Sequence, residues 1–309
     1  MENSVPRTGV RAALPGAVGM ALVGSSVAVS HTLVDAPLLT AQALRYALAA
    51  VLLVALARRV GVRIVSPRGT EWLWLGGVAA TGLVLFNVAV VRGVAHAEPA
   101  VVAVAVACAP VLLGVVGPLL QRQSPRGRIV LAAAVVTSGA VLVEGVGRTD
   151  ATGIAWAALA LGCEASFTLL AVPVLGRHGG WGVSVHSVWL GATMFVVLAS
   201  VVEGPAAVTR LDAADLAATA YLAVFVTVAA FLLWYTSVAA LGPGRVGLLM
   251  GIAPVSAALV GIATGSRAPG ALVWAGMAVV LAGLVVGLRP HRPRDVSAGR
   301  APVEAEADA

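Results

Sequence analysis

Lysine is absent from this sequence, and acidic residues, cysteine and aromatic residues are scarce. All 20 basic residues are arginine, only 11% of the 309 residues are charged, and 2 are cysteine. Without lysine the chain can form neither a retinal Schiff base nor a phosphate-binding loop, so energy for work must come from a gradient or a partner. Cys108 and Cys163 stand in separate apolar segments, where each behaves as a small hydrophobic residue rather than as a disulfide or metal ligand.

Apolar residues dominate what is present. They make up 60% of the chain, with a mean hydropathy of +0.97, whereas soluble proteins are about 45–50% apolar. A membrane-spanning helix needs about 20 consecutive apolar residues, and about ten such runs occur here. We therefore predict an all-α integral membrane protein whose helices cover residues 12–33, 38–57, 72–91, 99–120, 129–146, 153–174, 182–202, 216–240, 245–264 and 269–288.

The arginines fall mainly on one side of these predicted helices. Counting alternate loops places 15 arginines on one side and 4 on the other, with Arg45 inside a helix. The positive-inside rule then puts both termini, residues 1–11 and a tail of 289–309 that we expect to be disordered, in the cytoplasm. The net charge of +6 is explained in the same way, so we expect no nucleic-acid partner.

An internal repeat divides the predicted helices into two sets. Pro254 lies 144 positions after Pro110, each begins a similar apolar run, and Gly283 lies at the same distance from Gly139. Each half, 12–146 and 147–288, holds an odd number of predicted helices, so the second half enters the membrane inverted relative to the first. Inverted repeats are typical of secondary transporters, whose site lies near the midplane between the halves.

Several segments resemble the EamA family of the drug/metabolite transporter superfamily. In the second half they are the stretches Ala229–Tyr235, Ala239–Val246 and Ala253–Val255; in the first half they are Pro37–Ala41 with Arg45, Gly93–Ala97, and Ala109 with Pro110. The resemblance covers residues 12–288. It implies a ten-helix inverted-repeat transporter in the bacterial cytoplasmic membrane, commonly an exporter of amino acids, other metabolites or toxic compounds.

Five residues are candidates for a substrate site. A charge within the bilayer costs about 2.5–3.5 kcal/mol at a helix centre, so Glu164, near the middle of its predicted helix, is either a proton-carrying carboxylate or a structural group. Asn87 is a polar amide at depth that bonds another helix or contacts cargo. Trp234 either packs in the bundle or lines a cavity. Pro110 and Pro254 interrupt matching helices, which is the best sequence indicator of a central site.

Other polar residues have simpler interpretations. Arg45 is near a helix end and is either structural or a ligand-binding residue, while His186 is expected to be an interfacial residue. Arg92, His96 and Glu98 form either an outer vestibule or a loop cap. We find no metal-ligand spacing, no catalytic constellation and no cofactor motif.

The sequence therefore predicts a secondary active transporter that exports a small metabolite, amino acid or drug-like compound by alternating access. The alternatives are an importer or passive facilitator on the same fold, or an intramembrane enzyme. The expected partners are the lipid bilayer, a small-molecule substrate and protons as a candidate coupling ion, and a monomer is compatible with the sequence.

Overall fold

The structure is a computed structural model that describes residues 9–33, 35–145, 147–263 and 269–289. Within these ranges the regular structure is helical, apart from a single bridge between Ala97 and Thr149. The elements are α1 (Gly9–Ser30), η1 (His31–Leu33), α2 (Leu38–Val60), α3 (Glu71–Gly77), η2 (Val78–Leu85), α4 (Phe86–Val94), α5 (Pro99–Ala107), α6 (Ala109–Leu120), α7 (Gly127–Glu144), α8 (Ala151–Leu169), α9 (Val172–Val202), η3 (Pro205–Arg210), α10 (Ala213–Tyr221), η4 (Leu222–Ala229), α11 (Ala230–Leu241), α12 (Pro243–Val246), η5 (Gly247–Gly251), α13 (Ile252–Ala263) and α14 (Ala271–Leu288).

Nine helices in the described ranges are long and apolar enough to cross a membrane. Four of these spans are composite, because consecutive elements follow one another along them: α3, η2 and α4; α5 and α6; α10, η4 and α11; and α12, η5 and α13. The first helix, α1, is apolar over the shorter stretch Val10–Ser26. The prediction of an all-helical membrane protein is confirmed, and the count of ten spans stays a prediction.

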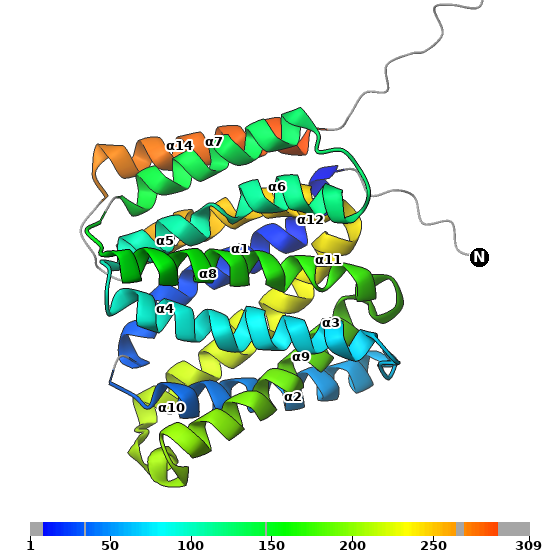
Figure 1. Ribbon diagram of the computed structural model, residues 1–309, viewed down its shortest axis with the longest axis vertical. Coiled ribbons are helices and arrows are strands. Elements are labelled where there is room, and N and C mark those ends of the chain that lie inside the picture. Colours follow the sequence, from blue (N-terminus) through cyan, green and yellow to red (C-terminus); the bar gives the residue numbers. More distant parts are fainter. Residues whose placement is uncertain (1–8, 34, 146, 264–268, 290–309) are drawn as a thin grey trace, which may run out of the picture.

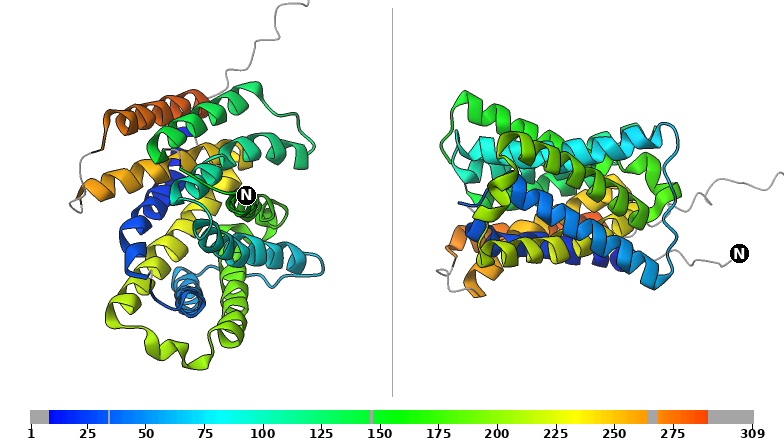
Figure 2. Two further views of the ribbon diagram at one scale, coloured as in Figure 1. Left: turned by 60° about the vertical axis from the view of Figure 1, so that its left-hand side comes forward. Right: turned by 90° about the horizontal axis from the view of Figure 1, so that it is seen from below.

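The helices lie roughly parallel and antiparallel, and packed pairs close the two sides of the bundle (Figures 1 and 2). Helices α7 and α14 form one pair, and α2 and α9 form the other. Between them α1 packs against α11 and α13, while α8 packs against α4 and α5. Helix α1 begins and α14 ends at the same end of the bundle, here called the terminal end, and the other is called the opposite end.

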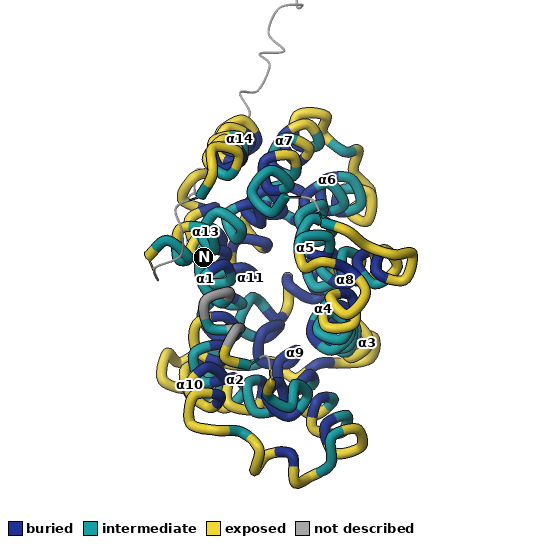
Figure 3. The backbone as a smooth tube through the Cα atoms, turned by 90° about the vertical axis from the view of Figure 1, so that its left-hand side faces the viewer, coloured by how far each residue is buried: buried dark blue, intermediate teal, exposed yellow. Residues whose placement is uncertain are grey.

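Burial follows this arrangement. Large side chains turned inward, such as Leu113, Tyr235 and Leu248, are fully buried, whereas Leu131, Val201 and Leu281 on outer faces are exposed. Figure 3 shows buried positions turned toward the middle of the bundle and exposed positions at its rim and loops. Exposed leucine and valine around a bundle are suited to contact with lipid chains, which are as apolar as they are.

The boundary between α8 and α9 differs from the predicted one. We expected helices over 153–174 and 182–202, but α8 ends at Leu169 and α9 begins at Val172. Gly179, with φ 60° and ψ −178°, interrupts α9 near its start. A residue with a side chain is strained at such a positive φ, so glycine permits the chain to bend there before it enters the bundle.

Candidate functional site

A polar network joins three spans between α2, α4 and η4. Arg45 Nε donates to Thr227 Oγ1 at 2.9 Å, and its NH1 donates to Gln42 Oε1 at 3.3 Å. Gln42 Nε2 donates to Asn87 Oδ1 at 3.1 Å, and Asn87 Nδ2 donates to Leu83 O at 2.6 Å. Gln42 and Arg45 are three residues apart, so one face of α2 carries both. We call Gln42, Arg45, Asn87 and Thr227 the Arg45 network.

An aromatic cluster lies where η2, α8 and α11 meet. The ring centroid of Phe167 is 4.8 Å from that of Phe231 and 5.2 Å from that of Tyr235. Tyr235 Oη donates to Phe167 O at 3.1 Å. Gly82 in η2 packs against the same phenylalanine, since a Cβ there would meet Phe167 Cβ at 2.7 Å. The ring of Phe167 is therefore held by three elements.

Trp234 is part of the same junction between α8 and α11. Its side chain is 2% exposed, and its indole Nε1 donates to Thr168 Oγ1 at 3.1 Å. An indole has a single donor and no acceptor, so this hydrogen bond satisfies it completely. Trp234 thus connects two helices beside the aromatic cluster.

Glu164 lies on α8 one turn before Phe167 and Thr168, and it is partly buried. The prediction placed it near the middle of its helix, but α8 ends at Leu169, so Glu164 stands five residues from that end. Among the described residues it makes no ion pair and no hydrogen bond through its carboxylate. A carboxylate so placed within a span is free to bind a proton or a ligand.

The two prolines stand just after helix interruptions. Cys108 separates α5 from α6, and Pro110 is the second residue of α6. The 3₁₀ segment η5 precedes α13, whose third residue is Pro254. Proline cannot donate to the preceding turn, so both spans change direction or pitch where the sequence indicates. Thr137 Oγ1 donates to Ala107 O at 3.1 Å and so satisfies one carbonyl at the first interruption.

Two spans contain π-helical segments beside these groups. Segments η2 and η4 each have eight residues, and their backbone hydrogen bonds span five residues rather than the four of an α-helix, which widens the helix there. Leu83, whose carbonyl receives Asn87, belongs to η2, and Thr227, which receives Arg45, belongs to η4. Single π-helical turns inside α-helices occur often at functional sites, so these segments mark the same region as the Arg45 network and the aromatic cluster.

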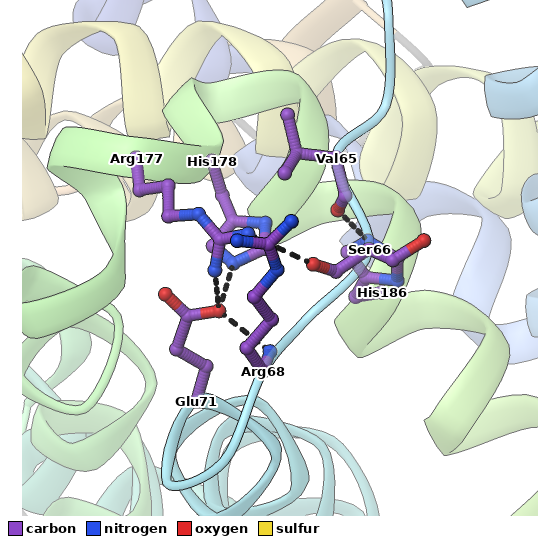
Figure 4. Close-up of polar contacts among 7 residues, drawn as sticks. All are labelled: Val65, Ser66, Arg68, Glu71, Arg177, His178 and His186. Atoms are coloured by element: carbon purple, nitrogen blue, oxygen red, sulfur yellow. Dashed lines mark hydrogen bonds and ion pairs between the residues drawn. The ribbon is translucent and has the colours of Figure 1, made fainter.

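A charged cluster at the terminal end joins the start of α3 to α9 (Figure 4). The Glu71 carboxylate accepts hydrogen bonds from Arg177 NH1, from the Arg68 backbone amide at 2.8 Å and from His178 Nε2 at 3.1 Å. Arg177 NH2 also donates to Ser66 O at 3.3 Å. We call Glu71, Arg177 and His178 the α3–α9 latch.

His186 adds a second contact between the α2–α3 connection and α9. Trp189 Nε1 donates to His186 Nδ1 at 3.2 Å, and His186 Nε2 lies 2.9 Å from Val65 O. Because an indole nitrogen only donates, Nδ1 must accept, and the ring proton resides on Nε2 and points to Val65. His186 is therefore neutral in this arrangement, and it joins the α2–α3 connection to α9.

At the opposite end, short contacts join successive loops. Arg148 Nε donates to Glu98 Oε1 at 2.9 Å, and His96 Nδ1 lies 3.5 Å from Asp150 Oδ2. The backbone amide of Gly153 holds the pKa of Asp150 below its ordinary value, since Asp150 caps the start of α8. His96 and Glu98, two of the three residues for which we left an outer vestibule or a loop cap open, pair with the loop before α8.

Comparison with known proteins identifies the first half of the chain. Residues 10–145 match the model of the EamA-like transporter family. The first half of the chain is therefore similar to EamA-like transporters. The predicted resemblance is thereby confirmed.

Two relatives extend the likeness beyond that half. A Bacillus subtilis (strain 168) protein named "Uncharacterized transporter YetK" is 26% identical over 251 residues, which cover 79% of this chain and 76% of the relative. A Streptantibioticus cattleyicolor protein named "Probable terminal-alkyne amino-acid exporter" is 26% identical over 247 residues, which cover 78% of this chain and 81% of the relative. The family and relatives indicate a transporter rather than an enzyme.

One protein of known crystal structure shares the fold. It superposes with a TM-score of 0.77 over 89% of this chain and 96% of its own length, at 19% sequence identity. The fold shared with that structure therefore extends over both halves of this chain.

Three of the five predicted site residues fall into two groups, and the two prolines lie apart from them in α6 and α13. Asn87 belongs to the Arg45 network, whereas Trp234 and Glu164 lie at the α8–α11 junction. Sequence reasoning missed the aromatic cluster and Glu71. A signal for Glu71 existed, because it is an acidic residue within three positions of Arg68 on the arginine-rich side of the chain.

Proposed function

We propose that this chain is a secondary active transporter that exports a small metabolite, amino acid or drug-like compound across the bacterial cytoplasmic membrane by alternating access. The main support for this proposal is that the helix interruptions occur in pairs whose members are separated by the repeat distance. Segments η2 and η4 begin and end 144 positions apart, as do Pro110 and Pro254. Matching irregular segments in two halves are the pattern of a midplane transport site.

The helix packing supports two inverted five-helix repeats. Val136 contacts Gly283 across the α7–α14 crossing, and Val280 contacts Gly139. Each member of one pair lies 144 positions from its counterpart in the other. A twofold relation between halves produces such reciprocal contacts.

The α3–α9 latch supports alternating access because it joins an element of the first half to one of the second. At the opposite end, Glu203 at the end of α9 accepts hydrogen bonds from the backbone amides of Leu39 and Thr40, both at 2.8 Å. Both ends of the interface between halves are thus held by a few polar contacts. A transporter that opens to one side at a time must release one such set while keeping the other.

Amino acids are a cargo class favoured by a specific observation. The relative from Streptantibioticus cattleyicolor is named as an amino-acid exporter. We infer that amino acids should be among the first compounds tested as transported substrates.

Counterflow in proteoliposomes tests the transport function. Vesicles loaded with unlabelled metabolite pools are expected to accumulate the matching labelled compound against its gradient, and protein-free vesicles serve as the control. Cells that lack the protein should retain its cargo. If none of the metabolites that such cells retain shows counterflow, that result would count against transport. If transport is equally fast in the opposite direction when the cargo gradient is reversed, the protein is a facilitator.

Glu164 is the proposed proton-coupling residue. Glu164→Gln keeps the size and hydrogen bonding of the side chain but removes its titration, so pH-driven transport should fall while cargo exchange persists. Glu98→Gln, in the loop at the opposite end, is the matched control. Equal pH-driven rates in Glu164→Gln and the parent would make Glu164 structural.

A further inference from the structure

Three arginines meet where α14 ends, at the terminal end of the bundle (Figure 1). Arg128 NH2, from the first turn of α7, donates to Arg289 O at 2.7 Å. Arg245 NH2, from α12, donates to Leu288 O at 3.1 Å. Arg126 immediately precedes α7, and its charge and that of Arg128 both act on Arg245, so the three guanidinium groups lie close together. We call Arg126, Arg128 and Arg245 the arginine triad.

The arginine triad carries more positive charge than its partners in the chain offset. The carboxyl end of a helix such as α14 is equivalent to about half a negative charge, whereas each guanidinium carries a full positive one. Among the described residues, Glu71 is the acidic residue at this end of the bundle, and Arg177 and His178 bind it in the α3–α9 latch. No ion pair between described residues involves the triad. The surplus charge is therefore available to an anion from outside the chain.

The triad also has hydrogen-bond donors to spare. A guanidinium has five N–H donors, and within the described part of the chain Arg128 and Arg245 each give one of them to the end of α14. Arg126 and Arg128 are exposed, so the donors that α14 does not use are open to the surroundings. An oxygen-rich anion at the surface can receive them.

Exposed apolar side chains continue from the triad along the outer faces of α7 and α14. Leu131 follows Arg128 by three residues on α7, and Val285 and Leu281 precede Arg289 by four and eight residues on α14. Such spacings place residues on one face of a helix. Because α7 and α14 close one side of the bundle, this face is suited to lipid chains (Figure 1). The surface thus joins positive charge at its rim to an apolar face along the span.

We propose that the arginine triad binds the phosphate of an anionic phospholipid, such as phosphatidylglycerol, in the membrane leaflet at the terminal end. Arginine donates paired hydrogen bonds to phosphate oxygens, and a charged acceptor makes these bonds short and strong. Basic groups between spans bind lipid headgroups on the cytoplasmic side of membranes, and the predicted topology places the terminal end on that side. The site does not depend on the proposed transport function.

The position of the triad gives the lipid a structural consequence. Arg126 and Arg128 belong to the first half of the chain, and Arg245 belongs to the second. One bound headgroup therefore joins the two halves on the α7–α14 side of the bundle, whereas the α3–α9 latch joins them elsewhere at the same end.

Lipid binding to the purified full chain in a neutral detergent tests the proposal, with native mass spectrometry as the readout. The probes are phosphatidylglycerol and phosphatidylcholine with identical acyl chains, so only the headgroup differs. The first phosphatidylglycerol is expected to bind at least about tenfold more tightly than phosphatidylcholine, because charge-assisted hydrogen bonds to a net anion are the stronger ones. Equal affinities would overturn the site.

Two double variants of equal charge examine the residues. Arg126→Gln with Arg128→Gln should weaken phosphatidylglycerol binding at least about tenfold and leave phosphatidylcholine binding unchanged. Arg58→Gln with Arg59→Gln is the matched control, since it removes two exposed arginines from the last turn of α2 at the same end, and it should leave both affinities unchanged. Equal losses in the two double variants would mean that net charge attracts the lipid and would contradict the site.

A single variant keeps the test decisive if the triad double variant does not fold. Arg126→Gln alters one exposed side chain and should still weaken phosphatidylglycerol binding about threefold or more. Unchanged binding in this variant contradicts the triad.

Glycerol 3-phosphate separates a lipid site from a site for a soluble phosphate. It carries a phosphate without acyl chains, so it lacks the apolar contact with α7 and α14. It should therefore fail to displace phosphatidylglycerol even at about a hundredfold excess over the lipid. Displacement at or below that excess would overturn the lipid as the occupant.

Discussion

The crossing of α7 and α14 is closed by glycines, and a single methyl group at Gly139 should weaken it measurably. A Cβ at Gly139 would lie 2.7 Å from Val280 N and 2.8 Å from Gly276 O. Carbon normally keeps about 3.5–4.0 Å from such atoms, so the two helices must separate by about 1 Å. Overpacking of this kind costs about 1–3 kcal/mol, and the higher helix propensity of alanine returns about 0.5–1 kcal/mol.

We therefore expect Gly139→Ala to lower the free energy of unfolding by about 1–2 kcal/mol in SDS titrations of protein in mixed micelles. Gly162 in α8 is the matched control, since a Cβ there meets nothing within 4 Å. Gly162→Ala should be neutral or stabilising. The double variant Gly139→Ala with Gly283→Ala should cost less than the sum of both, because one helix separation relieves both contacts. Unchanged unfolding of Gly139→Ala would refute the close crossing.

Three further predictions follow from the ends of the bundle. Glu71→Gln should loosen the α3–α9 latch. A cysteine placed at Val111 should then react faster with a thiol reagent added from the terminal side, whereas Glu98→Gln should not change its reactivity. Equal labelling of the Val111 cysteine in the parent, Glu71→Gln and Glu98→Gln contradicts the latch. Asp150 has a lowered pKa in the folded chain, so its cap stabilises fully above its unfolded pKa of about 3.9 and is lost as pH falls through the folded value. The thermal midpoint of Asp150→Ala should thus lie below the parent's at neutral pH and converge with it only as pH falls below the folded pKa of Asp150, while Asp150→Asn keeps the cap throughout. Reporter fusions at residue 309 and near Thr209 should report cytoplasmic and external positions respectively, and an external C-terminus would overturn the inverted-repeat proposal.

The predicted helices agree with the structure because their signal is long and uniform. A run of apolar residues the length of a bilayer needs no partner to be recognised, and backbone groups in lipid must bond within the helix. Boundaries are less certain, as at Leu169 and Val172, where apolar residues continue through a turn. The bend at Gly179 depends on a single backbone angle that the apolar pattern does not report.

The candidate site was predicted only in part. Asn87 and Glu164 drew attention because a polar residue at depth is rare, and the prolines because they interrupt a helix. Thr168 and Thr227 carried no such signal, since a threonine in an apolar helix usually bonds its own backbone. Their importance emerges from partners on other helices.

The sequence by itself determined that the chain is a helical membrane protein and roughly where its apolar helices lie. Those properties depend on composition and spacing along the chain, which the bilayer converts directly into helices. Only the tertiary structure decided which polar groups meet: Arg45 with Thr227, Glu71 with Arg177, and Trp234 with Thr168. Each pair is separated by 66 or more residues in sequence, so its energy exists only once the helices have packed.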